Sequence, residues 1–246
     1  MKRPLKTYNA DLHLHTVLSP CGDGQMVPEL IFSQALKNQV KVLAITDHNS
    51  TGNLPAFLRC CPPEIWVIPG MEVQTKEEIH LICLFPGLEP AMEWGRTVRA
   101  LLPPVRNEKG YFGPQIILDE RGKISGEEEL LLLNSIGLSL EETVVQVRNL
   151  GGIIYPAHID RPAFSINSQI GFIPATLEFR VLEISARTSW EQTSRQHPGY
   201  TLVQASDAHY LPQIGVKTST LQMAGLDWDE LLLALNRQEG RDVILH

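Results

Sequence analysis

The sequence predicts an α/β fold with a mainly parallel sheet. Short apolar segments rich in β-branched residues, such as 40–46 and 79–85, alternate with segments of helical pattern, such as 28–39 and 88–102. Strands that alternate with helices are typical of parallel sheets. The 246 residues, 43% of them hydrophobic, fit one large domain, because α/β barrels commonly reach this length undivided. We therefore expect a single domain over residues 1–246.

The first predicted strand carries two histidines on one face. In residues 11–16, Leu12 and Leu14 alternate with His13 and His15, which is the period-2 pattern of a strand. Side chains two residues apart share a face, so the imidazoles point the same way, about 6.5–7 Å apart along the chain. Neutral imidazole is a common metal ligand. Taken alone, the pair fits either a metal site or two buried histidines satisfied by hydrogen bonds.

The next elements follow in regular order. Pro28 opens a predicted helix over residues 28–39, and the apolar strand 40–46 ends at Asp47 and His48. The chain continues through a strand at 65–68 that runs on to Glu72, a strand at 79–85 that begins near His80, and a helix at 88–102 that Pro103 ends.

Residues 103–137 are interpreted as an insertion or lid within the domain. The turn Asp-Glu-Arg-Gly between apolar residues predicts a short hairpin over 115–124, and the pattern at 127–136 predicts a helix. The segment carries few groups that could take part in chemistry. Tyr111 and Phe112 fit either a lid tip with aromatic rings over the substrate or the place where the insertion packs on the domain, and we favour packing.

The regular alternation returns after the insertion. Ser139 is a favourable N-cap for another helix. The remaining elements are an apolar strand at 151–158 that ends in His158, strands at 177–185 and 202–205, the second of which leads into Asp207 and His209, and a last helix over 228–238 capped near Asp227.

Polar residues gather at the ends of the predicted strands. Most of the histidines and several acids stand at the start or just beyond the end of an apolar strand: His13, His15, His48, Glu72, His80, His158, Asp207 and His209. Each alone fits a core histidine or a surface acid. Together they predict a shared site, because unpaired polar groups in apolar surroundings are costly and barrel enzymes carry their chemistry at the C-terminal ends of the strands. Lys217 is a further candidate, for anion binding.

The motifs DLHLHT, ITDHNS, PGME, EEIHL, PAHIDR and SDAH span residues 11–209 in this order. They resemble those of the PHP (polymerase and histidinol phosphatase) family of metal-dependent phosphoesterases. The resemblance implies a distorted (β/α)7 barrel with two or three divalent metal ions at its C-terminal mouth. By position it implies that His13, His15 and Asp207 hold the first ion, that Glu72 bridges the first and second, that His80 and His158 complete the second, and that His48 and His209 hold a third.

The third implied site departs from the family pattern. Relatives with three ions usually carry Asp directly after the Ser of the first motif, whereas this chain has Pro20 there, followed by Cys21 and then Asp23. Either Asp23 completes the site through a longer loop, or the third ion is held loosely or is absent. Cys21 is an alternative thiolate ligand, or a structural cysteine.

The implied ligands suggest the metals and the reaction. Mixed imidazole and carboxylate ligands suit Zn, Mn or Fe(II) better than Mg or Ca. Two ions bridged by Glu72 supply an activated water for attack on phosphorus and neutralise the charge that develops there. Arg161 is the candidate phosphate clamp, with a surface ion pair to Asp160 as its alternative. His209 or a metal-bound water is the candidate proton donor to the leaving group.

Two acids near the ligands have expected supporting roles. Asp11 shares a strand face with His13, so we expect it to orient an imidazole. Asp47 precedes His48 and would face the opposite way on an extended backbone, so we expect it to be structural.

Composition limits the partners. A net charge of −7 argues against affinity for a phosphate backbone. We therefore expect a small phosphorylated metabolite or nucleotide as substrate, without stable nucleic-acid binding. The basic start lacks the apolar core of a signal peptide, and no apolar run reaches the roughly 18 residues that span a bilayer, which predicts a cytoplasmic protein without membrane association.

Two other functions stay open. Related barrels use similar metal centres to hydrolyse C–N bonds, so a metal-dependent amidohydrolase-like enzyme is one alternative. A non-catalytic PHP module, stabilised by metal and used for binding, is the other.

Overall fold

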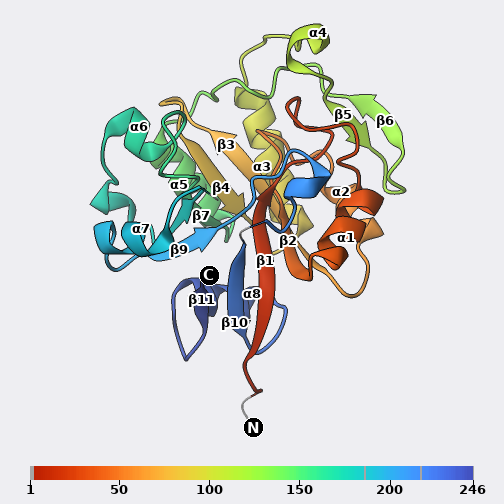
Figure 1. Cartoon of the computed structure of the whole chain (residues 1–246). Coiled ribbons are helices and arrows are strands. Elements are labelled where there is room, and N and C mark those ends of the chain that lie inside the picture. The colour runs from red at the N-terminus through yellow and green to blue at the C-terminus, as the bar shows by residue number, and fades with distance from the viewer. Residues whose placement is uncertain (1–2, 186, 217, 246) are drawn as a thin grey trace.

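The computed structural model of the protein describes residues 3–185, 187–216 and 218–245; Lys217 lies outside them. The largest element is a curled seven-stranded sheet with strand order β11-β10-β1-β2-β3-β4-β7 (Figure 1). The strands are β1 (Lys6–Leu14), β2 (Val40–Ile45), β3 (Trp66–Gln74), β4 (His80–Leu84), β5 (Ile116–Leu118), β6 (Ile124–Glu127), β7 (Ile153–Pro156), β8 (Val181–Ile184), β9 (Thr201–Gln204), β10 (Ser219–Met223) and β11 (Asp242–Ile244).

The large sheet is mixed. β1 pairs with β2 and β2 with β3 in parallel, whereas β4, β7, β10 and β11 pair with their neighbours in antiparallel fashion. The expectation of a mainly parallel sheet is therefore wrong beyond β1–β3. One reason is the short link at residues 75–79 between β3 and β4, because a parallel crossover needs a dozen or more residues.

A two-stranded ribbon lies across the open side of the curled sheet. Its strands β8 and β9 pair in parallel. At the β7 side, the Ile159 N–H donates to the Glu183 carbonyl at 2.9 Å, and at the β1 side the His15 N–H donates to the Ala208 carbonyl at 2.9 Å. The fold is α/β, as expected, but the distorted (β/α)7 barrel is not confirmed, because the wall consists of a curled sheet and a separate ribbon.

The helices are α1 (Pro28–Lys37), α2 (Leu54–Cys60), α3 (Leu88–Leu101), α4 (Lys109–Phe112), α5 (Leu140–Asn149), α6 (Ile166–Ile170), α7 (Trp190–Gln196) and α8 (Trp228–Leu235). Of these, α1, α2, α3 and α5 pack on the outer face of the curled sheet, whereas α8 packs against its inner side (Figure 1). The helices expected over 28–39, 88–102 and 228–238 are confirmed as α1, α3 and α8, although each ends earlier. Asp227 caps α8 by accepting a hydrogen bond from the Glu230 N–H at 3.0 Å.

The insertion contains the expected hairpin but not the expected helix. β5 and β6 form the hairpin, whereas residues 127–136 are mostly irregular. The buried Gln115 side chain accounts for this: its amide donates to the Leu130 carbonyl at 2.7 Å and its oxygen accepts from the Leu132 N–H at 2.9 Å, in place of helical hydrogen bonds. Tyr111 is 81% exposed, so the expectation that it packs is wrong.

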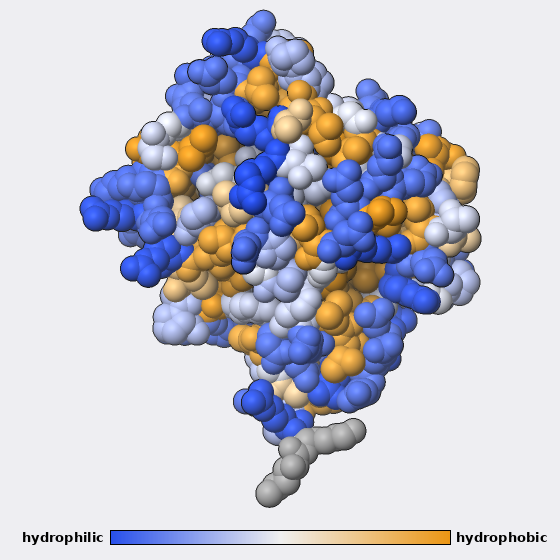
Figure 2. Space-filling model, turned by 180° about the vertical axis from the view of Figure 1, so that it is seen from behind, coloured by the Kyte–Doolittle hydropathy of each residue, from blue (hydrophilic) through white to orange (hydrophobic). Residues whose placement is uncertain are grey.

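Two apolar clusters hold the layers together. One lies between the sheet and the outer helices and includes Phe57 and Trp94, and the other includes Leu12, Ile68 and Leu231 and joins the inner side of the sheet to α8. Seen from behind, hydrophobic and hydrophilic residues are interspersed over the surface (Figure 2). Within the described residues, no helix is long and apolar enough to cross a membrane.

Candidate metal centre

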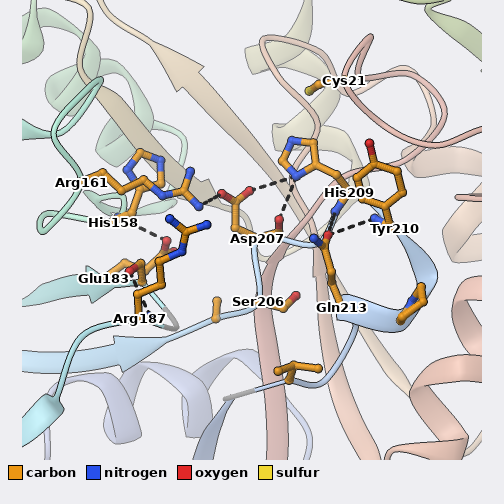
Figure 3. A pocket seen from close by; sticks show the side chains of 14 residues that line it. Cys21, His158, Arg161, Glu183, Arg187, Ser206, Asp207, His209, Tyr210 and Gln213 are labelled. Carbon is orange, nitrogen blue, oxygen red and sulfur yellow. Dashed lines mark hydrogen bonds and ion pairs between the residues drawn. The ribbon is translucent and has the colours of Figure 1, made fainter.

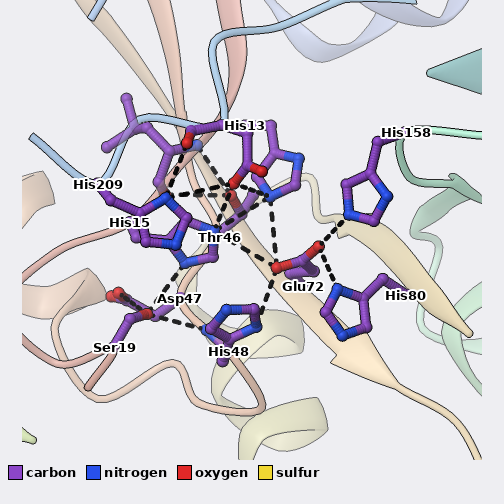
Figure 4. A network of polar contacts seen from close by, with 12 residues as sticks. His13, His15, Ser19, Thr46, Asp47, His48, Glu72, His80, His158 and His209 are labelled. Atoms are coloured by element: carbon purple, nitrogen blue, oxygen red, sulfur yellow. Dashed lines mark hydrogen bonds and ion pairs between the residues drawn. The ribbon is translucent and has the colours of Figure 1, made fainter. Parts of the chain in front are cut away.

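The strand-end histidines and acids meet in one buried group. Figure 4 shows Glu72 at its middle, with His13, His15 and His48 on one side and His80 and His158 on the other. Among the described residues, three sets have ligand atoms close enough to hold a metal ion: His13, His15, Glu72 and Asp207; His48, Glu72 and His80; and His15, His48 and His209.

His13 in β1 and His15 just after its end point nitrogen lone pairs at each other. His13 Nδ1 donates to the Glu183 carboxylate at 3.0 Å. His15 Nδ1 lies 3.0 Å from Ser19 Oγ, and because that hydroxyl donates its proton to Asp47 at 2.7 Å, it accepts from His15. Both Nε2 atoms therefore carry lone pairs, yet they are 3.2 Å apart. A cation between them, or a proton on one ring, satisfies both.

The surrounding carboxylates favour positive charge at this point. Burial alone would lower the pKa of His13, but Glu183, Asp207 and Glu72 raise it well above its ordinary value. Burial, together with His209 and His48, lowers the pKa of His15 well below its ordinary value. Without a metal ion, His13 therefore favours its protonated form and His15 its neutral form.

The spacing of the first cluster fits a tetrahedral ion. Asp207 Oδ1 lies 3.3 Å from His13 Nε2 and 3.0 Å from His15 Nε2, and Glu72 Oε2 lies 3.4 Å from each of these nitrogens. Ligand atoms held about 2.0–2.1 Å from a tetrahedral ion lie about 3.3–3.4 Å from one another. The donor set and its spacing therefore fit a transition-metal ion.

Glu72 presents one oxygen to each side of the group. Oε1 lies 2.8 Å from His80 Nδ1 and 3.1 Å from His158 Nε2, and Oε2 lies 2.9 Å from His48 Nδ1 without forming a hydrogen bond. Burial would raise the pKa of Glu72, but His80, His13 and His48 hold it well below its usual range. A buried carboxylate that faces imidazoles with both oxygens is suited to bridge two cations.

His80 repeats the lone-pair arrangement. The Gln74 amide nitrogen donates to Ser135 Oγ at 2.9 Å, so its oxygen accepts from His80 Nε2 at 3.1 Å. His80 Nδ1 then faces the Glu72 carboxylate as a second acceptor. The second cluster therefore also fits a cation.

Two of the candidate ligands have strained backbones. His158 and Asp207 have φ of 29° and 49°, a region that side-chain-bearing residues rarely adopt. The Glu183 side chain holds His158 in place by accepting its N–H at 3.2 Å. Such strain is concentrated at functional sites.

Cys21 and His209 line the same cavity beside the third cluster. His209 Nδ1 donates to the Asp207 carbonyl at 2.8 Å, which leaves Nε2 free. Burial alone would raise the pKa of Cys21, but the neighbouring His48 and His209 imidazoles lower it to about 6.

Asp23 lies outside these clusters. Its carboxylate accepts from the Gln25 N–H at 2.9 Å in an exposed turn, and only its backbone approaches the site, where its N–H donates to the His209 carbonyl at 2.8 Å. Completion of the third site by Asp23 would require its carboxylate to reach the ligands. The structure does not bring it there.

The two supporting acids have different roles. Asp47 accepts hydrogen bonds from Thr16 and Ser19 and fixes the loop after β1, which agrees with a structural role. Asp11 accepts the backbone N–H groups of Ser206 and Gly215, both at 2.9 Å. It positions the loop that carries Asp207, rather than orienting an imidazole by a hydrogen bond.

Sequence reasoning missed Glu183. Its side chain is 1% exposed and contacts His13 and the backbone of His158. The available signal was an acid within the apolar strand Val181–Ile184, because a buried charge needs a partner.

A cavity of about 560 Å³ opens beside the clusters. Figure 3 shows Arg161 and Arg187 on one side of Asp207, with His209 and Tyr210 on the other. Arg161 Nη2 contacts Asp207 Oδ2 at 2.5 Å. The ion pair expected as the alternative for Arg161 is absent from the described contacts, because Asp160 accepts from Ser185 and Thr188 instead.

This fold and this ligand set define the class of α/β metal-dependent hydrolases. The PHP domain model matches residues 11–151, more than half of the chain. The chain belongs to the PHP family. The match includes His13, His15, His48, Glu72 and His80 and ends before the remaining candidate ligands.

Known proteins extend the comparison. The 5'-3' exoribonuclease Rnm of Salmonella typhimurium LT2 is 38% identical over 80 residues, which cover 30% of this chain and 26% of that protein. The lesion-specific endonuclease EndoQ of Pyrococcus furiosus has a similar fold, with a TM-score of 0.71, 17% identity and coverage of 98% of this chain and 58% of that one. Endonuclease Q in complex with a 27-mer duplex that bears an abasic lesion has a TM-score of 0.69 and 17% identity. The match covers 96% of this chain and 58% of that one. The chain thus spans about a quarter of the curated relative's length.

These relatives overturn one expectation. We expected a small phosphorylated substrate and no nucleic-acid binding, yet the matched proteins are nucleases by name, and one was crystallised with a DNA duplex. The error came from the net charge of −7, because net charge averages over the whole surface while bound cations and nearby arginines set the field at a site.

Proposed function

We propose that the chain is a metal-dependent phosphoesterase that hydrolyses phosphodiester bonds in nucleic acid. The observation that carries this proposal is Glu72, a buried carboxylate with one oxygen toward each of two ligand clusters. A carboxylate that bridges two cations is suited to phosphoryl chemistry. The nuclease names of the relatives support nucleic acid as the substrate class.

The residues divide into two ligand sets. His13, His15 and Asp207 with Glu72 Oε2 would hold one ion, and His80 and His158 with Glu72 Oε1 a second. Imidazole and carboxylate donors suit Zn²⁺, Mn²⁺ or Fe²⁺. When bound, such ions supply an activated water and neutralise charge on the phosphoryl oxygens.

The cavity residues suit a phosphodiester substrate. The exposed guanidinium of Arg187 and the N–H groups of Arg161 not used by Asp207 can bind phosphoryl oxygens in pairs. Tyr210, which is 51% exposed, offers a ring on which a base can stack. A cavity of about 560 Å³ is of the size that encloses small ligands rather than a long duplex. We therefore favour a strand end or an unpaired nucleotide as the part bound there.

Of the two roles considered for His209, ligand and proton donor, the contacts favour that of ligand. Its Nδ1 proton is donated to the Asp207 carbonyl, and its other nitrogen belongs to the third cluster. Neither nitrogen is free to protonate a leaving group. The cavity beside His209 admits water, which can supply that proton.

The test compares substrate classes under one set of conditions. The full chain, loaded with Mn²⁺ or Zn²⁺, is incubated with labelled single-stranded RNA, single-stranded DNA and a duplex, and products are resolved on a denaturing gel. We expect the parent protein to cleave at least one of these nucleic acids. EDTA should abolish this cleavage, and the Glu72→Gln variant should not show it. Absence of metal-dependent cleavage of every nucleic acid would overturn the proposal. Hydrolysis of an amide substrate instead would support the amidohydrolase-like alternative.

A further inference from the structure

Phe164 is an exposed aromatic residue next to the second cluster. Its ring stacks on the His80 imidazole, with 4.9 Å between the ring centroids and 16° between the ring planes. The residue is nevertheless 41% exposed. One face of the ring is therefore covered by a candidate metal ligand, while the rest of the side chain remains accessible from solvent.

Packing alone does not account for a phenylalanine at this position. Phe164 has a φ of 57°, a region in which a bulky residue is an outlier and which glycine adopts without strain. The residue is not among the buried members of either apolar cluster, so it gives up part of the stabilisation that burial of apolar surface supplies. Strained residues of this kind are concentrated at functional sites. A role in binding explains both the strain and the exposure.

The loop that carries Phe164 is fixed to its surroundings by hydrogen bonds. The Phe164 carbonyl accepts the His80 N–H at 2.8 Å. The next residue, Ser165, donates its hydroxyl proton to the Arg161 carbonyl at 2.7 Å and caps α6. The ring therefore has a fixed position relative to both the second cluster and Arg161, the candidate phosphate clamp.

Phe164 and the cavity lie on different sides of Glu72. His80, on which the Phe164 ring stacks, faces Glu72 Oε1, and Figure 4 shows it across Glu72 from His209. His209 and Tyr210 line the cavity, whereas Phe164 is not among the described residues that line it. A phosphodiester held between the two clusters would have the cavity and Tyr210 on one side and the Phe164 ring on the other.

We propose that the Phe164 ring stacks on the nucleobase that lies across the reacting phosphate from the cavity. Every nucleobase has a π face, so this contact requires no particular sequence. A base offers its face to a protein ring where it is not stacked within a duplex, as in a single strand. The substrate is thus a single strand with a base on each side of the reacting phosphate, one on Tyr210 and one on Phe164. The inference rests on the proposed function and deepens it.

Matched strands with and without bases test the proposal. A single-stranded oligonucleotide and a strand of equal length built from abasic tetrahydrofuran residues carry the same phosphates. Phe164→Leu keeps an apolar side chain but removes the ring, so it should raise KM for the base-carrying strand by about fivefold or more and leave KM for the abasic strand unchanged. Phe164→Tyr should behave as the parent protein does. The control Phe172→Leu, at an exposed phenylalanine beyond α6, should change neither KM.

Tryptophan fluorescence supplies a readout that does not depend on cleavage. A phosphorothioate strand, which resists hydrolysis, is titrated into metal-loaded Phe164→Trp protein. We expect base stacking to quench the added tryptophan beyond any change in the parent protein, whose four tryptophans supply the baseline. An abasic phosphorothioate strand should not quench it. Absence of quenching by the base-carrying strand, or an equal rise of KM for both strands in Phe164→Leu, would overturn the proposal.

Two further measurements separate base stacking from other roles of the ring. A fall in Zn²⁺ affinity in Phe164→Leu without a base-dependent change in KM would mean that the ring only positions His80, and would overturn the proposal. Because the two rings contact different bases, the changes in KM for Phe164→Leu and Tyr210→Ala should multiply in the double variant. A smaller combined change would place both rings on one base and refute the two-sided arrangement.

The proposed function and this inference fail separately. If the parent protein cleaves no nucleic acid, the proposed function is overturned, but the quenching titration still decides whether Phe164 binds a base. If the parent protein cleaves a strand and the Phe164 variants match it on both strands, the inference alone is overturned.

Discussion

Substitution of Glu183 tests whether a residue that touches no candidate metal position controls the centre. Its carboxylate accepts from His13 Nδ1 at 3.0 and 3.2 Å and from the His158 N–H at 3.2 Å. Glu183→Ala leaves both donors buried without partners, at a cost of about 1–3 kcal/mol each. Loss of a partner that orients a ligating histidine typically weakens metal binding by about 10- to 100-fold.

Two variants separate charge from orientation. Glu183→Gln keeps an oxygen that can accept from His13 but removes the negative charge, so we expect a smaller loss of affinity than in Glu183→Ala. Zn²⁺ affinity is measured by competition with a chelating dye, and the free energy of unfolding by urea titration. Affinity within twofold of the parent protein in both variants would refute the positioning role.

Three further predictions address the chemistry. Glu72→Gln should reduce metal-dependent hydrolysis by at least about a hundredfold, because both clusters lose a shared anionic ligand; retention of full rates in a steady-state assay would contradict the bridging role. Arg187→Ala should raise KM for an oligonucleotide by about tenfold, through loss of charge-assisted hydrogen bonds. The control Arg195→Ala, on α7 outside the cavity, should leave KM unchanged. Equal KM values for Arg187→Ala and the parent protein would exclude Arg187 from substrate binding. In metal-free protein the lowered pKa of Cys21 keeps it a thiolate above about pH 6. Its alkylation rate, followed by mass spectrometry, should therefore fall as the pH drops through about 6. A midpoint of the rate against pH that lies above pH 8 would contradict this.

The sequence was most informative where one local rule decided the outcome. The alternation in residues 11–16 placed His13 and His15 on one face, and the ends of apolar strands located Glu72, His158 and Asp207 together. These inferences needed only strand geometry and the cost of burying polar groups.

Longer-range contacts limited the rest of the prediction. The irregular path of residues 127–136 depends on Gln115, whose amide replaces helical hydrogen bonds. Glu183 meets His13 across 170 positions of sequence. Asp23 was a candidate to complete the third site through a longer loop, but the turn at Gln25 uses its carboxylate. Each outcome depends on a tertiary contact or turn that residue type and spacing do not encode.

The ribbon of β8 and β9 has a mechanical consequence for the centre. His13 and Glu72 lie on the curled sheet, whereas Asp207 follows β9 on the ribbon. Backbone hydrogen bonds at Ile159 and His15 connect the ribbon to the rest of the wall. An ion held by His13, Glu72 and Asp207 would add a further link between the curled sheet and the ribbon. Removal of the metal by a chelator should therefore speed amide hydrogen exchange in β8 and β9 more than in β2. The reason is that the free energy of metal binding would stabilise the attachment of the ribbon to the sheet.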